Sequence, residues 1–558
     1  MKRARNEHRG RLGTVAMSLL VASMALATGS VFAGSATWSM SPTSGDWNTA
    51  ANWVPATVPN GPSDIATFSA SNRATVSLSA GVEIDSIVFG TGASAFTIAA
   101  QNSSTTLTLS GTGVVNDSGI TQAFVVGSDP SGDQNFLIFR NSATAGALTS
   151  YAVDPGQVAR LVGGEILFFE SSQAGSASFV INAARVRDAI GGIALFMDTA
   201  SAATGVFTVN GGTSGSGGEV DFDGSASAGS ATFTVAGAGG VNATGGVVIF
   251  SENSTAATGT FVTNGPSNGG LVGGLVNFEG SATAGDAVLI ANPGSGFQFE
   301  DSSDGGSARV EAFGSGGFNI ASNHTLPGAT VGSVEGNGVI QVGASNLSIG
   351  SNSLSTTFSG LIADAPPGGS ISKIGNATLT LTGANIYTGG TTVSSGTLVV
   401  SNKTGSATGT GAVSVNTGTL GGSGTVSGAV TIGQGGFVAP AHGTKAQATL
   451  TIQSGLTFNA GSTYTYTFKA KKKKAKTDKV VASGVTINSG ATFNFSGTAQ
   501  GVLKQGLVLT LISDTAATPI AGTFSNLPNG AILTVNGNNF QANYEGGDGN
   551  DLTLTVVP

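Results

Sequence analysis

Cysteine is absent from this sequence of 558 residues, and histidine occurs only three times. Without cysteine no disulfide can form, so burial and strand pairing have to stabilise the fold. The histidines, His8, His324 and His442, are far apart in sequence, and there is no HExxH pattern, so the sequence predicts no zinc site. No GxSxG turn with a suitable histidine after it is present, so a serine hydrolase is not predicted either.

Charged residues are also scarce, at 9% of the sequence, whereas 40% of the residues are hydrophobic. Intrinsic disorder needs the opposite balance, so a folded chain is predicted. The 88 glycines do not recur at every third position, which excludes collagen. Abundant Gly, Thr and Val are typical of short strands joined by turns. The formal net charge of −8 gives no general attraction to nucleic acid, so no nucleic-acid partner is predicted.

Residues 1–33 have the composition of a secretory signal peptide. A basic start precedes an apolar segment from about residue 15 to 27, and Val31 and Ala33 stand where a signal peptidase reads before cleavage at Gly34. A membrane anchor is the alternative, but the apolar segment is shorter than the 18 or more residues of a typical span, and no second candidate follows. We therefore expect an exported protein with no transmembrane span after signal removal.

One pattern recurs from about residue 131 to 312: a glycine pair, a short strand ending in Phe, a polar Ser/Ala turn, a glycine and a second strand. The segments GGEILFFESSQAGSASFVI and GGEVDFDGSASAGSATFTV are two of its copies. The first aromatic column is predicted to contain Phe139, Phe169, Phe196, Phe222, Phe250, Phe278 and Phe299. The second is predicted to contain Phe179, Phe207, Phe233 and Phe261.

Strands this short cannot bury an apolar face alone, so each must lie against its counterpart in the next repeat. Parallel stacking about 4.8 Å apart would set Phe on Phe along the interior. The repeat is too short for a propeller blade, which needs about 40–50 residues. A β-sandwich would not explain Phe at near-constant spacing. The sequence therefore predicts an all-β parallel β-helix of about twenty coils, on the order of 100 Å long.

A different repeat follows in KIGNATLTLTGANIYTGGTTVSSGTLVV (373–400), where apolar residues alternate with threonines. With the residues just before it, this segment resembles the autotransporter-associated β-strand repeat, also called the passenger-associated transport repeat. The usual form is K-x-G-x-G-x-L-x-L-x-G-x-N-x-Y-x-G-x-T, ending in G-x-L. The matching residues are Lys373, Gly375, Leu379, Leu381, Gly383, Asn385, Tyr387, Gly389, Thr391, Gly396 and Leu398, whereas Ala377 stands where Gly is usual.

This resemblance implies a secreted, right-handed parallel β-helix that is displayed on, or released from, the surface of a bacterium, and it implies no reaction. We expect the location to be extracellular or on the outer cell surface. The resemblance is to the passenger, without a translocator barrel. Such a barrel carries aromatic girdles, whereas this chain has five tyrosines and no tryptophan after Trp53.

The pattern along the chain predicts five parts and two capped ends. They are a signal peptide (1–33), a Trp-rich cap with the first coils (34–125), Phe-anchored repeats (126–330), coils that carry the autotransporter-associated repeat at 371–400 (331–460), and C-terminal strands with a cap (461–558). Caps are expected because the last coils of a solenoid would otherwise pair with other chains.

All three tryptophans, Trp38, Trp47 and Trp53, lie near the start of the predicted mature chain. Indoles at a surface can stack on sugar rings, which makes these residues candidates for contact with a glycan. The structural alternative is an aromatic plug over the first coil, closed by Asp64 and Phe68. The same block resembles the start of many secreted β-strand repeat proteins, which favours the plug.

The segment KAKKKKAKTDK (469–479) holds seven of the twelve lysines. We expect a solvated loop at a coil corner, with Lys471, Lys472, Lys473 and Lys474 as candidates for contact with an anionic surface or polymer. No aromatic residue interrupts the lysines, so stacking on nucleic-acid bases is not indicated.

The segment GGDGNDLTL (546–554) is close to the calcium-binding nonapeptide of β-helices. It occurs once, and consecutive coils each have to supply half of such a site. We therefore expect a turn before the last strand and no cofactor, with calcium ligation by Asp548 and Asp551 as the lesser alternative.

Acidic residues recur after the Phe positions between residues 219 and 312, and stacked coils would bring some of them close together. Paired carboxylates could hydrolyse a polysaccharide, but an acidic ridge that prevents lateral aggregation explains them more simply. The sequence thus predicts a structural or adhesive surface protein without catalytic activity. The alternative is an extracellular β-helix that binds or degrades carbohydrate, of the pectin lyase kind.

Overall fold

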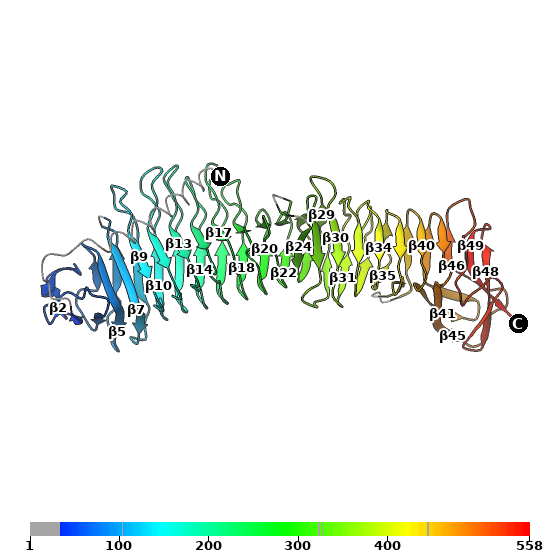
Figure 1. Cartoon of the computed structure of the whole chain (residues 1–558), viewed down its shortest axis with the longest axis horizontal. Helices are drawn as coiled ribbons and strands as arrows, with labels where there is room; N and C mark the ends of the chain where they lie inside the picture. Colours follow the sequence, from blue (N-terminus) through cyan, green and yellow to red (C-terminus); the bar gives the residue numbers. More distant parts are fainter. Residues whose placement is uncertain (1–33, 103, 322–323, 326, 443–445) are drawn as a thin grey trace.

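The computed structural model describes residues 34–102, 104–321, 324–325, 327–442 and 446–558. The predicted signal peptide, residues 1–33, lies outside them. The described chain is a long rod of stacked β-coils, with the first coils at one end and the last coils at the other (Figure 1). It is an all-β parallel β-helix of about 18 turns, as the sequence predicts. The one helix in the described part is η1 (Ala50–Asn52), and no helix there has the length and hydrophobicity to cross a membrane.

Sheet A forms one side of the rod. It has fifteen strands: β2 is antiparallel to β1, and the other fourteen pair in parallel along the rod. In pairing order they are β2 (Trp53–Val54), β1 (Ala36–Trp38), β3 (Ile65–Phe68), β5 (Val82–Phe89), β7 (Thr106–Asn116), β9 (Phe136–Phe139), β11 (Glu165–Phe168), β13 (Ile193–Phe196), β15 (Glu219–Phe222), β17 (Val247–Phe250), β19 (Leu275–Phe278), β21 (Gly296–Phe299), β23 (Gly317–Asn319), β26 (Val339–Gln341) and β29 (Leu361–Ala363).

Sheet B forms a second side and continues further toward the C-terminal end. Its parallel strands are β4 (Thr75–Ser77), β6 (Thr97–Ala100), β8 (Gln122–Val126), β10 (Thr149–Val153), β12 (Ser178–Ile181), β14 (Val206–Val209), β16 (Thr232–Val235), β18 (Thr260–Thr263), β20 (Val288–Ala291), β22 (Arg309–Ala312), β25 (Ser333–Gly336), β28 (Thr356–Phe358), β31 (Thr378–Leu381), β33 (Thr397–Val400), β35 (Thr419–Gly422), β38 (Phe437–Val438), β41 (Thr463–Lys471) and β45 (Thr492–Gln500). A short strand, β42 (Lys474–Thr477), adds to β41 in the antiparallel direction.

The third side of each coil lies between a strand of sheet A and the next strand of sheet B, and it changes along the rod. In the Phe-anchored repeats it is one residue wide, a column of isolated parallel bridges through Thr144, Gln173, Ser201, Ser227, Thr255, Thr283 and Asp304. Beyond residue 327 it becomes sheet C, with the parallel strands β24 (Gly328–Val331), β27 (Asn346–Ile349), β30 (Ser370–Lys373), β32 (Thr391–Val393), β34 (Val413–Val415), β37 (Val430–Ile432), β40 (Leu456–Phe458) and β44 (Val485–Ile487).

Two columns of stacked aromatic rings fill the interior of the Phe-anchored repeats. The first contains Phe139, Phe168, Phe196, Phe222, Phe250, Phe278 and Phe299, and the second contains Phe124, Tyr151, Phe179, Phe207, Phe233 and Phe261. Ring centroids within a column are 4.5 to 4.9 Å apart. This separation equals the spacing of neighbouring strands, so the strand register sets the stacking.

One member of the predicted first column is wrong. Phe168, and not Phe169, pairs with Phe139 and Phe196 in sheet A and stacks on both rings. Successive side chains of a strand point to opposite faces, so a shift of one residue moves Phe169 out of the core. Phe169 instead joins Phe136 and Met197 around a second cluster, formed by Ile138, Leu167 and Leu195, that is separate from the main core.

Alanines complete the interior beside the aromatic columns. Ala226 and Ala228 flank the bridge residue Ser227 and are fully buried, and the neighbouring coils repeat this arrangement. Two phenylalanine rings already occupy most of each coil's cross-section, so only a small side chain fits on the third side. At the glycine pairs the backbones of neighbouring coils lie close together. A Cβ on Gly217 would lie 2.2 Å from the carbonyl oxygen of Gly245 in the next coil.

The N-terminal end of the rod is closed by the tryptophans. Trp38, Trp47 and Trp53 are at most 2% exposed, and their rings pack against one another and against Phe68. Their indole N–H groups donate to backbone carbonyls. The prediction that these tryptophans contact a glycan at the surface is wrong, because buried indoles have no free face on which a sugar could stack. They form the aromatic plug instead.

The C-terminal end is closed by sheet D, which changes from parallel to antiparallel pairing. Its strands are β36 (Thr425–Val426), β39 (Thr449–Ile452), β43 (Lys479–Ala482), β46 (Val508–Asp514), β49 (Asp551–Val557), β48 (Asn538–Gly546) and β47 (Ile532–Val535). The last three strands form an antiparallel meander. From this meander Phe540 packs edge-on against Phe468 and Phe495 of sheet B, which covers the last coil.

Candidate functional site

The lysine-rich segment forms a β-hairpin at the C-terminal end of the rod, where the sequence analysis expected a loop. In the antiparallel register of β41 and β42, Lys471 lies opposite Lys474 and Lys469 lies opposite Lys476. Lys472 and Lys473 make the turn between the strands. The hairpin forms because TYTYTF before the lysines alternates as a strand, and β41 continues from it through Lys471 instead of ending at the coil corner.

The hairpin has two different faces. Residues that pair directly across strands point to the same side of a sheet, so the four strand lysines share one face. β45 pairs in parallel with β41 and adds Thr498 and Gln500 to that face. On the opposite face Ala470 is buried, and Ala475 and Ala499 pack against the hydrophobic core. We call the first side, with Lys469, Lys471, Lys474, Lys476, Thr498 and Gln500, the lysine face.

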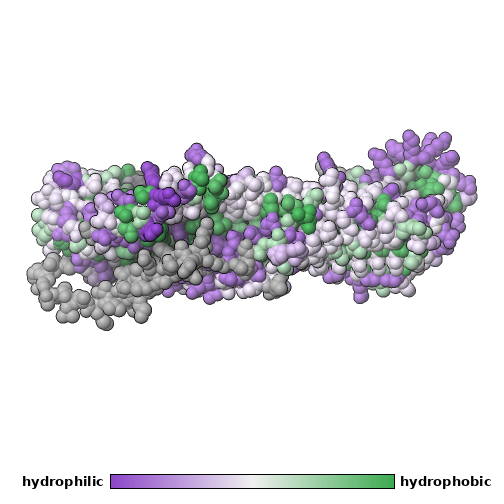
Figure 2. Space-filling model, turned by 90° about the horizontal axis from the view of Figure 1, so that it is seen from above, coloured by the Kyte–Doolittle hydropathy of each residue, from purple (hydrophilic) through white to green (hydrophobic). Residues whose placement is uncertain are grey.

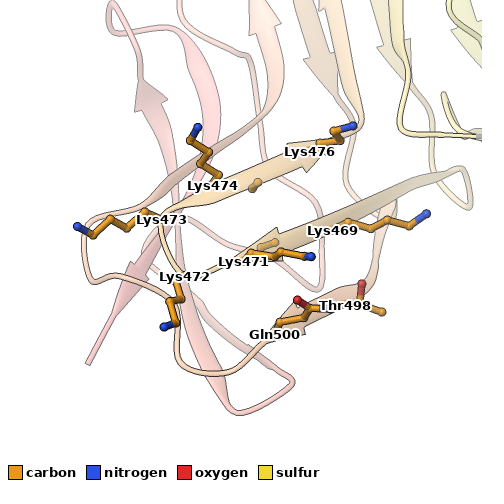
Figure 3. A pocket seen from close by; sticks show the side chains of 10 residues that line it. Lys469, Lys471, Lys472, Lys473, Lys474, Lys476, Thr498 and Gln500 are labelled. Carbon is orange, nitrogen blue, oxygen red and sulfur yellow. The ribbon is translucent and has the colours of Figure 1, made fainter.

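The lysine face is open to solvent. All six lysines from Lys469 to Lys476 are exposed, and they border a hollow of about 810 Å³ together with Thr498 and Gln500. Figure 3 shows their ammonium groups pointing away from the hairpin in several directions. Figure 2 shows strongly hydrophilic side chains gathered at this end of the rod. Among the described residues the ion pairs all involve arginine, so none of them neutralises a lysine of this face.

A buried carboxylate fixes the base of the hairpin. Asp478 is fully buried, and its carboxylate accepts hydrogen bonds from the backbone N–H groups of Ala448 and Thr467 and from the Thr467 hydroxyl. Burial raises the pKa of Asp478, although these hydrogen bonds oppose the shift. Asp478 thus joins the two strands at the root of the hairpin and attaches them to the segment before β39, which holds the lysines in one register.

The predicted calcium segment is a turn before β49. The Asp551 carboxylate accepts a hydrogen bond from the Asp514 N–H at 3.0 Å. The Asp514 carboxylate in turn accepts from the N–H groups of Gly484 and Val485. Within the described ranges no group of three or more His, Cys, Asp or Glu side chains could hold a metal ion. Calcium ligation by Asp548 and Asp551 stays a prediction.

Several acidic residues of the Phe-anchored repeats bind backbone groups at the turns. Asp301 accepts from the Gly280 N–H, and Asp304 accepts from the N–H groups of Gly305 and Thr330. The ring of His324 lies 2.8 Å from the carbonyl oxygens of Thr325 and Ser303. These groups therefore order the turns between coils.

One carboxylic acid with a shifted pKa was missed in the sequence. Glu165, at the start of β11, is 3% exposed, and burial raises its pKa to about 7. The side-chain amide of Gln134 donates a hydrogen bond to it. The only sequence signal was its place beside a glycine pair, before a strand, which does not indicate burial.

The segment that resembles the autotransporter repeat buries several of its polar residues. Lys373 is 1% exposed, and its ammonium group donates to the carbonyl oxygens of Ile374, Gly375 and Ser395. Desolvation lowers the pKa of Lys373 to about 8. The Tyr387 hydroxyl lies 2.6 Å from the Thr391 hydroxyl inside the rod.

Asn385 joins three successive coils at a place where sheet A has ended and sheet D has not begun. Its side-chain oxygen accepts from the Ile362 N–H at 2.8 Å, and its side-chain nitrogen donates to the Ala407 carbonyl at 2.6 Å. Asn385 thereby replaces the ladder bonds that strands provide elsewhere. In β31 Leu379 and Leu381 are buried whereas Thr378 and Thr380 are not, so the alternation of apolar residues and threonines in the sequence corresponds to an inward and an outward face.

Comparison with known proteins supports the resemblance of this segment to the transport repeat. Residues 371–400 match the family model of the passenger-associated-transport-repeat. No curated protein sequence matches the chain. Among solved structures, the crystal structure of the Haemophilus influenzae Hap adhesin is similar at 11% sequence identity, with a TM-score of 0.29. The similar region covers 89% of this chain and 64% of the adhesin chain, so this chain spans less than two thirds of that protein. The protein is thus a parallel β-helix that carries a passenger-associated transport repeat.

Proposed function

We propose that this protein is an exported bacterial passenger-type rod with a structural and adhesive role at the cell surface or in the extracellular matrix. The observation that carries the proposal is the passenger-associated transport repeat at 371–400, built into one uninterrupted β-helix. Repeats of this kind are named for their association with exported passengers, and a rod of stacked coils suits presentation at a distance from the cell.

The mechanism would be weak contact repeated along the rod. Outward positions of sheet B are mostly Thr, Ser and Val, as in the TFTV strand of β16, where Thr232 and Thr234 are exposed. Each such contact is weak, but many contacts on one rigid body act together through a high effective concentration. Surface glycans and anionic polymers are the proposed partners.

The export half of this proposal is tested by fractionating bacteria that express the full chain. We expect the protein in the outer-membrane fraction or the medium, shortened at its N-terminus, and sensitive to protease added to whole cells when it is surface-bound. Recovery of full-length protein from the cytoplasm alone would contradict it. A glycan array and a cell-attachment assay with the purified rod test the adhesive half.

A carbohydrate-active β-helix is the second candidate, and Glu165 is the observation that favours it, because a carboxylic acid that is half protonated near neutral pH suits general acid catalysis. Its burial and its hydrogen bond from Gln134 argue against contact with a sugar chain. Release of reducing sugar from acidic or neutral polysaccharides by the wild type, lost in Glu165→Gln, would establish the second candidate and refute a role without catalysis.

A further inference from the structure

We propose that the lysine face is a binding site for an acidic polysaccharide, a polymer that bears carboxylate, sulfate or phosphate groups at regular intervals. This inference names a partner for the adhesive function proposed above and rests on it for its biological setting. The site itself is argued from the hairpin's register, its charge and its surroundings.

The first argument is the arrangement of the charges. The antiparallel register places two lysine pairs directly opposite each other, Lys471 with Lys474 and Lys469 with Lys476. Directly opposed residues lie about 5 Å apart across the strands, and alternate residues lie about 7 Å apart along a strand. The backbone positions of four lysines therefore form a small rectangle, from which long side chains with mobile ammonium groups extend, and two further lysines lie at the turn (Figure 3).

The second argument is energetic. Like charges directly opposite each other destabilise a sheet, and lysine is not a favoured strand residue. The whole chain is acidic, with a formal net charge of −8 even with these lysines included, yet no acidic residue occurs between Lys469 and Lys476. A bound polyanion would neutralise the four lysines at once and release its own counterions.

A protective role is the competing explanation, because lysines on an edge strand prevent edge-to-edge aggregation, and β42 is such a strand. Protection requires only charge at the edge. It does not explain why Lys469 and Lys471 stand on β41, an inner strand that is paired on both sides by β42 and β45.

The third argument selects a polysaccharide among polyanions. Thr498 and Gln500 add a hydroxyl and an amide to the lysine face, and these groups suit hydroxyl-rich partners. The face has no aromatic side chain on which nucleic-acid bases could stack. It has no row of large apolar side chains that could enter a lipid bilayer. The long lysine stems border the hollow and can cover a sugar ring while their ammonium groups reach its acidic substituents.

The test uses the full mature chain and two variants with the same change in charge. The site variant carries Lys469→Gln, Lys471→Gln, Lys474→Gln and Lys476→Gln. The control variant carries Arg160→Gln, Arg185→Gln, Arg187→Gln and Lys403→Gln, four exposed cations elsewhere on the rod. The probes are polygalacturonate, dextran sulfate and neutral dextran, with phosphatidylglycerol vesicles and single-stranded DNA for comparison, measured by calorimetry at 50 and 200 mM salt.

We expect the wild type and the control variant to bind an acidic polysaccharide and not neutral dextran, with affinity falling steeply with salt. The site variant should bind about tenfold or more weakly. Its melting temperature should equal or exceed that of the wild type, because the repulsion between the paired lysines is removed. Equal binding by the site variant would overturn the proposal. So would binding of vesicles or DNA in preference to both acidic polysaccharides. If no probe binds and the site variant aggregates, the lysines protect the edge strand and the proposal is wrong.

The outcome can be separated from that of the proposed function. A rod that is exported and attaches to cells equally well with the wild-type and the site-variant hairpin would refute the polysaccharide site but leave the adhesive role intact. A rod that binds polygalacturonate through the lysine face but stays in the cytoplasm would refute the proposed role at the cell surface and leave the polysaccharide site intact.

Discussion

The Phe-anchored coils and the coils around the transport repeat fill the interior of the rod with different kinds of side chain. Between β9 and β18 each coil fills its interior with two large rings and small side chains, mostly alanine, and its third side is a single bridge residue. Between β24 and β40 the rings are mostly replaced by Leu, Ile and Val, and the third side becomes a full strand. The total volume inside a coil has to stay constant for the stack to continue, so a change on one side requires a change on the others.

The two regions also differ in where polar groups are buried. In the aromatic coils the third-side residues bond through their backbones from coil to coil. In the transport repeat Lys373 and Asn385 are themselves buried and serve as hydrogen-bond partners for backbone groups that no strand satisfies. The aromatic coils therefore repeat one packing arrangement, whereas the coil of the transport repeat depends on particular buried polar side chains.

The largest expected effect is the loss of one ring from an aromatic column. Phe233→Ala should lower the free energy of unfolding by about 3–5 kcal/mol, because the cavity lies between Phe207 and Phe261 and the rigid stack cannot close it. Guanidinium unfolding measures the loss, and hydrogen exchange should show it centred on the neighbouring coils. Thr234→Ala, an exposed position on the same strand, is the control and should change little. A small effect for Phe233→Ala would mean that the columns do not hold these coils together.

The next effect concerns the polar core of the transport repeat. Asn385→Leu should cost about 2–4 kcal/mol, because it leaves the Ile362 N–H and the Ala407 carbonyl without their partner. Asn376→Leu, at an exposed position of the same segment, serves as the matched control. Denaturation by guanidinium compares the two, and equal stability would show that Asn385 does not replace ladder bonds.

A larger side chain on the third side of an aromatic coil should lower the free energy of unfolding by a smaller amount. Ala228→Val places a side chain of the kind found on sheet C beside two phenylalanine rings and should destabilise by about 1–3 kcal/mol through overpacking. Ser225→Val, exposed in the same turn, should be tolerated. If Ala228→Val is as stable as the wild type, the third side has spare room and the constant-volume argument fails.

The smallest effect is a pH dependence above pH 8 that arises from Lys373 of the transport repeat. The folded pKa of Lys373 is about 8, below the value near 10.4 of an unfolded lysine. Between these values the unfolded chain binds the proton that the folded chain has lost, so stability rises with pH. We expect about 1 kcal/mol of added stability between pH 8 and pH 9.5. Lys373→Met should abolish the rise and Lys403→Met should not; a rise that persists without Lys373 would assign it to another group.

Much of the fold was predictable because its residues repeat. The spacing of Phe196, Phe222 and Phe250 identified a solenoid, and the alternation around Leu379 identified the inward face. The choice between Phe168 and Phe169 was decided wrongly, since adjacent phenylalanines look alike in sequence. The strict register of the stack removes that ambiguity, because only Phe168 keeps the column continuous.

The candidate site was predictable in composition but not in form. A run of lysines indicated an exposed cationic segment, yet the sequence did not reveal a hairpin with paired lysines on one face. That pairing depends on where β41 leaves the coil and on the buried Asp478 at its root. For the tryptophans the sequence left two alternatives, a glycan contact and the favoured plug, and their packing at the end of the rod decided for the plug.

The sequence by itself determined that this protein is a repetitive all-β rod without disulfides, because spacing and alternation are properties of the chain alone. Only the tertiary structure decided which polar residues lie inside the rod and which cations share one face. The buried polar positions depend on the register between successive coils, which no local pattern of the sequence specifies. The shared cation face depends on where the hairpin register begins, which the buried Asp478 helps to fix. For that reason Lys373 serves the core while Lys471, the same type of side chain, faces the solvent.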